Sequence, residues 1–194
     1  FKEMVDNTFN SITVDGDTST SDMVLLVFVK NEDKGIRPGN FSKSEFKKSL
    51  KDLMLKLAHF IVKDGEGASK FITISVKGTS RDDDARKVAF SIANSPLFKT
   101  AMAGSDLNWG RLIMAIGKSG VKVNEKNISI KFGNHFVIKK GKDFLKFSLK
   151  EIKRYLRRKE IEIFIELGDS RNQAKVWTCD LTKDYISINT DYRS

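Results

Sequence analysis

Cysteine and histidine are scarce in this chain, and each shortage excludes a kind of site. The 194 residues include one cysteine and two histidines. Cys179 cannot form an internal disulfide, which fits a reducing compartment, and its apolar neighbours are typical of a core position. Because His59 and His135 lie far apart and no second cysteine is present, no zinc-binding spacing exists, and we expect no structural metal.

Long apolar runs are missing as well. The longest, Met23–Val29, has seven residues, whereas a helix that crosses a bilayer needs about 20, so we expect no membrane span. The chain opens on Phe1 without an initiator methionine or a signal sequence, and we expect further sequence to precede it in the gene product. With 40% hydrophobic and 31% charged residues, the composition excludes collagen and a disordered chain.

Positive charge is in excess, because 35 Lys and Arg against 25 Asp and Glu give a net charge of +10. Such an excess raises the hypothesis of a basic nucleic-acid-binding module. The cations are spread along the whole chain, however, and lysine is far commoner than arginine. A solvated helix face is the simpler interpretation of the densest group, which consists of Lys150, Lys153, Arg154, Arg157, Arg158 and Lys159.

Apolar spacing predicts a mixture of helices and strands. The clearest helix begins at Ser42, which forms a capping box with Glu45, and it ends near Asp64, where we expect Gly65 to take the left-handed conformation. Residues 71–76 then alternate as in a half-buried strand. The other expected elements are a helix tail over 1–10, strands over 12–14 and 23–29, helices over 80–94 (capped by Ser80 and Asp83 and stopped at Ser95-Pro96), 108–117 and 148–159, two or three short strands over 121–140, and strands over 161–165, 175–181 and 185–189.

Together these elements predict an α+β fold, a layered sandwich of mixed sheets with packed helices. No repeat or low-complexity segment divides the chain. We place a soft boundary near Gly78, which gives an N-terminal α/β region over 1–78 and a C-terminal α+β domain over 79–194.

Polar residues are concentrated in two loops. The octet 15–22 carries three acids and four hydroxyls between apolar segments, and its carboxylates can accept backbone N–H bonds and fix a tight turn, or act directly in catalysis. Glu66 lies between Gly65 and Gly67, where the backbone can approach a ligand closely. Glu66 therefore suits an ammonium group or proton transfer, and an incidental surface residue at a helix end is the alternative.

Two further segments are candidates for the site. Asn108 and Trp109 combine a helix cap with an aromatic ring, a combination that can bind anions at a helix start, although packing beneath the turn is the simpler interpretation. The tail over 184–194 stays aromatic to its end. Because ordinary termini fray, we expect this tail to be docked and to place side chains in a site.

Four segments, taken together and in order, resemble one family. Residues 12–22, 64–70, 103–120 and 179–194 are similar to the β chain of the arginine-biosynthesis glutamate N-acetyltransferase, also called ornithine acetyltransferase. Residues 121–175 carry little of the resemblance. Four motifs in register are far more specific than any one of them.

The resemblance implies an acyltransferase fold of the N-terminal-nucleophile type and an enzyme of arginine biosynthesis. Family members are made as one precursor that cleaves itself into α and β chains, and the new N-terminal Thr of β becomes the nucleophile. This Thr takes acetyl from N2-acetylornithine and passes it to glutamate, and the α chain supplies the oxyanion groups. The resemblance further implies a cytoplasmic α2β2 heterotetramer with no tightly bound cofactor, no nucleic acid and no membrane. Some members also accept acetyl-CoA as a co-substrate.

Carried over residue by residue, the family's substrate-binding positions fall on Glu66, Asn189 and Ser194. Glu66 offers a charge to a substrate ammonium, Asn189 a donor and an acceptor, and Ser194 a hydroxyl and a carboxylate. The octet around Asp17 and the Asn108-Trp109 turn match as supporting groups. Ser69 stands where Thr is commoner.

The nucleophile is the main departure from the family pattern. It is expected upstream of Phe1, and Thr8 lies inside a helix-like segment, so no catalytic residue is assigned in this chain and we expect no acetyl transfer by these residues alone. A related N-terminal-nucleophile aminopeptidase, or an inactive homologue, is the alternative within the same fold. A basic nucleic-acid-binding module is the alternative outside it.

Overall fold

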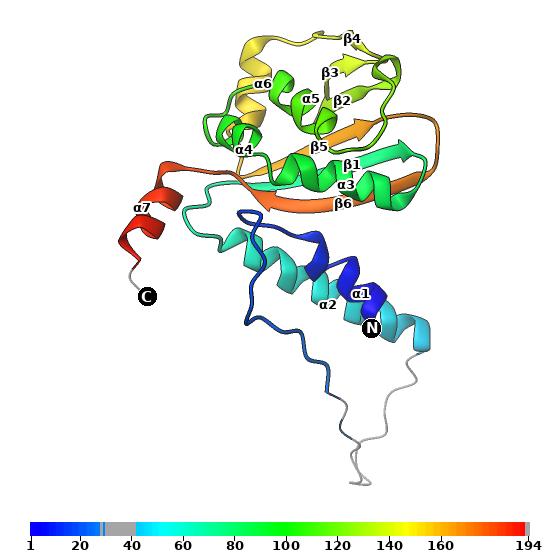
Figure 1. The fold of residues 1–194 in the computed structure, drawn as a ribbon, viewed down its shortest axis with the longest axis vertical. Coiled ribbons are helices and arrows are strands. Elements are labelled where there is room, and N and C mark those ends of the chain that lie inside the picture. The colour runs from blue at the N-terminus through cyan, green and yellow to red at the C-terminus, as the bar shows by residue number, and fades with distance from the viewer. Residues whose placement is uncertain (28, 30–41, 193–194) are drawn as a thin grey trace.

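A six-stranded mixed sheet organises the chain (Figure 1). The structure is a computed structural model that describes residues 1–27, 29 and 42–192. The strand order is β4-β3-β2-β5-β1-β6, with β1 parallel to β5 and the remaining neighbours antiparallel. The strands are β1 Phe71–Thr79, β2 Ser129–Phe132, β3 His135–Lys139, β4 Lys142–Asp143, β5 Glu160–Glu166 and β6 Asn172–Cys179.

Helices cover both faces of this sheet (Figure 1). Helices α3, α4 and α5 pack on one face, and α2 packs on the other near one edge. The predicted α+β fold is therefore confirmed. The helices are α1 Lys2–Asp6, α2 Lys43–Lys63, α3 Asp82–Ala93, α4 Pro96–Ala103, α5 Trp109–Gly117, α6 Leu149–Leu156 and α7 Lys183–Asp191, with 3-10 turns at η1 Phe9–Ser11 and η2 Glu125–Asn127.

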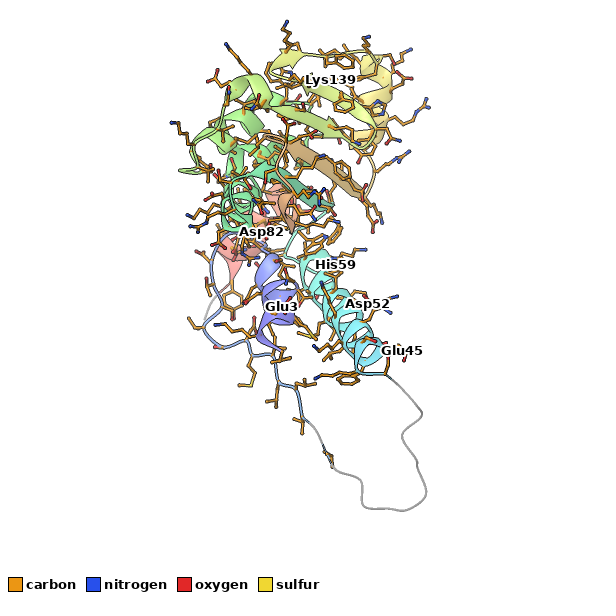
Figure 2. The ribbon with its side chains drawn as sticks, turned by 90° about the vertical axis from the view of Figure 1, so that its right-hand side faces the viewer. Glu3, Glu45, Asp52, His59, Asp82 and Lys139 are labelled. Carbon is orange, nitrogen blue, oxygen red and sulfur yellow. The ribbon has the colours of Figure 1, made fainter. Side chains whose placement is uncertain are left out.

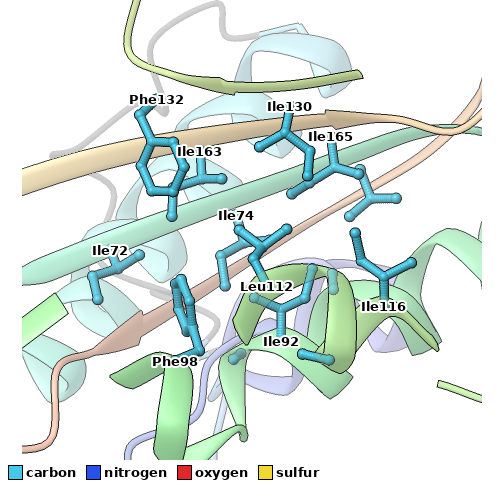
Figure 3. Close-up of a cluster of buried hydrophobic side chains, with 14 of the residues drawn as sticks. Ile72, Ile74, Ile92, Phe98, Leu112, Ile116, Ile130, Phe132, Ile163 and Ile165 are labelled. Carbon is cyan, nitrogen blue, oxygen red and sulfur yellow. The ribbon is translucent and has the colours of Figure 1, made fainter. Parts of the chain in front are cut away.

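The alternation of β1 divides the core in two. Ile72 and Ile74 are fully buried and face α3, α4 and α5, as Figure 3 shows. Phe71 points to the opposite face, where it meets Trp177 of β6 and Val62 of α2. The larger cluster holds most of the buried apolar side chains, so it supplies most of the hydrophobic free energy of folding.

Side-chain caps begin α2, α5 and α6, whereas α1, α3, α4 and α7 start without one. The capping box of Ser42 and Glu45 is present as predicted. The predicted cap at Ser80 is wrong, because Arg81 is the N-cap residue of α3 and has no side-chain capping bond; three aspartates in the first turn favour the helix dipole instead. Pro96 follows the end of α3 and also begins α4, since a proline loses no hydrogen bond in a first turn.

Three strands expected from β-rich composition do not form in the described residues. The segment 185–189 belongs to α7, whose contacts with the rest of the chain override the strand preference of its isoleucines. Residues 23–27 and 29 have no strand hydrogen bonds and are largely exposed. Phe28 of that predicted strand lies outside the described residues. Ile12 makes one parallel bridge with Trp177, which is all that remains of the strand predicted over 12–14.

The turn after α2 also differs from the expectation. Gly65 does not adopt a positive φ; the left-handed residue of this turn is Gly67, with φ of 63°. The boundary proposed at Gly78 stays a prediction, and Gly78 itself lies within β1. In the described parts of the chain, no helix has the length and apolarity to cross a bilayer.

The core assignment makes a stability prediction. We expect Leu112→Ala to lower the free energy of unfolding by about 2–5 kcal/mol, because this fully buried side chain leaves a cavity between α5 and the sheet. Leu149→Ala is the matched control, since Leu149 is 70% exposed on α6 and its loss should cost under about 0.5 kcal/mol. Urea denaturation measures both, and equal losses would contradict this packing.

Candidate functional site

The turn that follows α2 and the start of α7 are in close contact. Gly67 lies so near α7 that a Cβ built on it would be 2.4 Å from the backbone nitrogen of Tyr185. The hydroxyl of Thr182 donates a hydrogen bond to the carbonyl oxygen of Gly67 at 2.7 Å. The left-handed backbone and the missing side chain of Gly67 are thus both required for this approach.

This approach joins two side chains that are 123 residues apart in the sequence. Nδ2 of Asn189 donates to Oε2 of Glu66 at 2.6 Å, and it also donates to the carbonyl oxygen of Tyr185 at 2.9 Å. Both Glu66 and Asn189 are exposed. Among the described residues no group hydrogen-bonds Oδ1 of Asn189, so this acceptor and the second Glu66 oxygen can face a ligand.

The polar octet joins the same group of residues. The hydroxyl of Tyr185 donates to Oδ2 of Asp15 at 3.0 Å, while Oδ1 of Asp15 accepts the backbone N–H of Asp17 at 2.9 Å. Burial, the hydrogen bond to Asp15 and the charges of Asp15, Glu66 and Asp17 raise the pKa of Tyr185. Three carboxylates therefore affect the ionisation of this phenol, one of them through a direct hydrogen bond, and their combined negative potential favours a cationic ligand.

Asp180 fixes the chain that leaves the turn. Its carboxylate is 2% exposed and accepts hydrogen bonds from the backbone N–H groups of Ser69 and Lys70, both at 2.8 Å, and from the Ser69 hydroxyl at 2.5 Å. The Lys70 ammonium donates to the carbonyl oxygen of Met102 and to the Ser105 hydroxyl. Asp180 follows β6 just before α7, so it holds both sides of the Glu66–Asn189 contact in place.

A buried lysine fixes the octet in a similar way. Lys99 is 2% exposed, and its ammonium donates to the carbonyl oxygens of Val14 and Cys179 at 2.5 and 2.6 Å and to the Thr178 hydroxyl at 2.9 Å. Burial lowers the pKa of Lys99. Because Val14 immediately precedes Asp15, this lysine connects the octet to the end of β6.

The structure brings together most of the residues predicted for the site. Glu66 and Asn189 are in contact, and Asp15 of the octet is bonded to the same helix as Asn189. The prediction that octet carboxylates accept backbone N–H bonds is confirmed at Asp15, where Gly16 takes a φ of 100°. Ser194 lies outside the described residues.

The Asn108-Trp109 turn behaves as the simpler interpretation predicts. Oδ1 of Asn108 accepts the backbone N–H of Arg111 and caps α5, and Trp109 packs half-buried against the larger core cluster. Asn108 also donates to the Asp106 carboxylate, and Arg111 donates to the carbonyl oxygen of Leu97 in α4, so these hydrogen bonds stay local rather than reaching Glu66. Within the described parts of the chain, no three His, Cys, Asp or Glu side chains gather in a way that could hold a metal ion.

Three contributors to the site are not identifiable from the sequence alone. The sequence predicts a strand at Tyr185, whereas its position in α7 directs its hydroxyl to Asp15. Asp180 and Lys99 carry no local signal of their roles, because their partners are distant in the sequence.

Comparison with known proteins shows the family of this chain. A sequence profile of the ArgJ family matches residues 1–194. This chain belongs to the ArgJ family. It is 47% identical over 188 residues to the arginine biosynthesis bifunctional protein ArgJ of Zymomonas mobilis, covering 96% of this chain and 46% of that protein. With ArgJ of Bartonella quintana the identity is 46% over 197 residues, covering 99% and 48%.

The ArgJ relatives also include a solved structure. A crystal structure of the arginine biosynthesis bifunctional protein ArgJ from Bacillus halodurans matches with a TM-score of 0.88 and 39% identity, covering 98% of this chain and 90% of that chain. The present chain spans about half the length of the curated ArgJ proteins that it matches. The resemblance carried by the four motifs is therefore confirmed at the level of the ArgJ family.

The Gly67 contact can be tested by filling it. We expect Gly67→Ala to cost about 1–2 kcal/mol for its left-handed backbone and more for the clash with Tyr185, and to detach α7. Gly120→Ala is the control, because Gly120 also has a positive φ but no atom lies within 4 Å of the position its Cβ would occupy. Hydrogen exchange should rise in α7 for the first variant alone; equal protection of α7 in both would contradict this dependence on Gly67.

The buried ammonium predicts a pH dependence. The pKa of Lys99 is lowered in the folded state, whereas lysine in an unfolded chain titrates at about 10.4. At pH values between these two pKa values the unfolded state therefore binds more protons than the folded state. The free energy of unfolding consequently rises with pH over this range. We expect the free energy of unfolding of the protein, minus that of Lys99→Met, to increase over this range in urea denaturation. Lys87→Met, at an exposed position of α3, should show no such trend. A pH-independent difference for Lys99 would contradict the assignment.

Proposed function

We propose that this chain is the β-chain part of a glutamate N-acetyltransferase that moves acetyl from N2-acetylornithine to glutamate. The observation that carries the proposal is the 2.6 Å hydrogen bond between Asn189 and Glu66, the two described residues to which the family's substrate contacts are assigned. Membership of the ArgJ family supports the same reaction.

The chemistry is acyl transfer through a covalent ester. A threonine hydroxyl attacks the acetyl carbonyl of N2-acetylornithine, the amide C–N bond breaks, and ornithine leaves with its amine reprotonated. The amine of glutamate then attacks the acetyl-threonine ester, which yields N-acetylglutamate and returns the proton to the threonine oxygen. Each tetrahedral intermediate carries a negative oxygen that needs hydrogen-bond donors.

This chain is proposed to bind and orient the substrate rather than to supply the nucleophile. Glu66 faces the substrate ammonium, helped by the negative potential of Asp15 and Asp17. Asn189 offers Oδ1 to the substrate while its amide nitrogen holds Glu66 in position. Ser194 adds its hydroxyl from the tail that follows α7. Holding a substrate in an attack geometry supplies a large part of the acceleration in such reactions.

The remaining groups are proposed to come from outside this chain. A threonine upstream of Phe1 is the nucleophile, generated by self-cleavage of a precursor, and an α chain supplies the oxyanion donors in an α2β2 assembly. Two findings support this division: the chain spans about half of its curated relatives, and it covers 90% of the chain in the solved ArgJ structure. We further propose a cytoplasmic enzyme without a tightly bound cofactor, with acetyl-CoA as a co-substrate to be tested.

The charge of Glu66 gives the test of this function. In the complete enzyme we expect Glu66→Gln to lower kcat/KM for transfer from N2-acetylornithine by about 10- to 100-fold, since the substrate ammonium loses its counter-charge while the size of the side chain is kept. Glu125→Gln, in the 3-10 turn η2, is the control and should leave turnover unchanged. Wild-type kinetics in the Glu66 variant would remove this residue from the site.

A further inference from the structure

Helix α2 carries a second apolar stripe that the rest of the described chain leaves exposed. Its buried side consists of Met54, Ala58 and Val62, and Val62 packs with Phe71 and Trp177 of the sheet. The exposed stripe consists of Leu53, Leu57, Phe60 and Ile61, whose exposed fractions are 54%, 45%, 53% and 50%. These four residues recur at intervals of four, three and one, so they form a continuous band along one side of the helix.

The position of α2 keeps this band away from the sheet. Figure 2 shows α2 running from His59, beside the strands, to Glu45 at its far end, where no strand accompanies it. The helix has 21 residues and is about 31 Å long, yet none of its residues before Met54 is buried. A helix of this length with a second apolar band is typical of an element that packs between two layers, and the described chain supplies one of those layers.

The occupant is indicated by the missing length and by charge. The identity of the occupant rests on the proposed function, in which the present chain is one product of a longer precursor. The companion chain then corresponds to the half of the ArgJ relatives that the present chain does not match. Helix α2 carries six lysines against two carboxylates, so a partner with an acidic rim would complement it. A second copy of the chain would instead place two such basic helices together.

We propose that Leu53, Leu57, Phe60 and Ile61 of α2 form the docking surface for the companion chain, which covers them with an apolar face bordered by acidic side chains. Burial of the four side chains would supply hydrophobic free energy for holding the two chains together, and the lysines would pair with the acidic border. This surface lies on α2, whereas the Glu66 contact lies beyond its C-terminal end, so assembly through the stripe brings the companion chain next to the turn that carries Glu66.

Thiol labelling of the complete processed protein tests the surface without any measure of activity. We expect Leu57→Cys to react with a maleimide about tenfold more slowly than Leu149→Cys, although both positions are exposed in this chain. The native Cys179 is buried and adds little background. Equal rates at the two positions would overturn the docking surface.

Photo-crosslinking identifies what covers the stripe. With p-benzoylphenylalanine in place of Phe60, mass spectrometry of the complete protein should find the crosslinked peptide in the companion chain. Crosslinks to a second copy of this chain, or none in a protein that contains both chains, would overturn the proposal. A purified protein with no companion chain would instead refute the proposed function. If Glu66→Gln left turnover unchanged, the proposed role of Glu66 would fail, but the crosslinking result would still stand.

Discussion

The close approach of Gly67 to the first turn of α7 is the constraint on which the candidate site depends. With any larger residue at this point, α7 could not lie where Asn189 reaches Glu66 and Tyr185 reaches Asp15. None of those side chains is deeply buried, so hydrophobic packing alone does not define their positions. Their geometry comes instead from the backbone contact at Gly67 and from two buried charged groups, Asp180 and Lys99, whose hydrogen bonds hold the adjoining segments.

The buried charges of Asp180 and Lys99 explain how the exposed polar residues of the candidate site keep fixed positions. Each of them bonds to backbone groups of segments that are distant in the sequence, and a buried charge without those partners would be strongly unfavourable. The segments therefore have one low-energy arrangement rather than several. Any ligand that binds beside Glu66 would meet carboxylates that are already positioned, which lowers the entropic cost of binding.

The elements with strong periodic patterns are the ones that the sequence predicts well. The capping box and apolar spacing of α2, and the alternation of β1, follow from local rules and appear as expected. The tail cannot be assigned in this way, because its isoleucines and tyrosines favour a strand while contacts at Gly67 and Glu66 favour a helix. The same limit applies to residues 23–27 and 29, which are β-rich but pair with no strand in the described chain. Glu66 and Asn189 are identified through motifs, and only the folded chain brings them together.

The order of strands in the sheet also determines when the site can be assembled. β1 ends at Thr79, but its two neighbours in the sheet, β5 and β6, begin at Glu160 and Asn172. Such distant pairings form slowly, because the chain loses the entropy of closing a long loop before the strand contacts contribute any favourable free energy. During synthesis β1 therefore emerges from the ribosome long before either neighbour, with both of its edges unpaired. The surroundings of Glu66 are among the last parts of the chain to form, and a polypeptide interrupted before β6 would leave an edge of β1 unpaired and prone to aggregation.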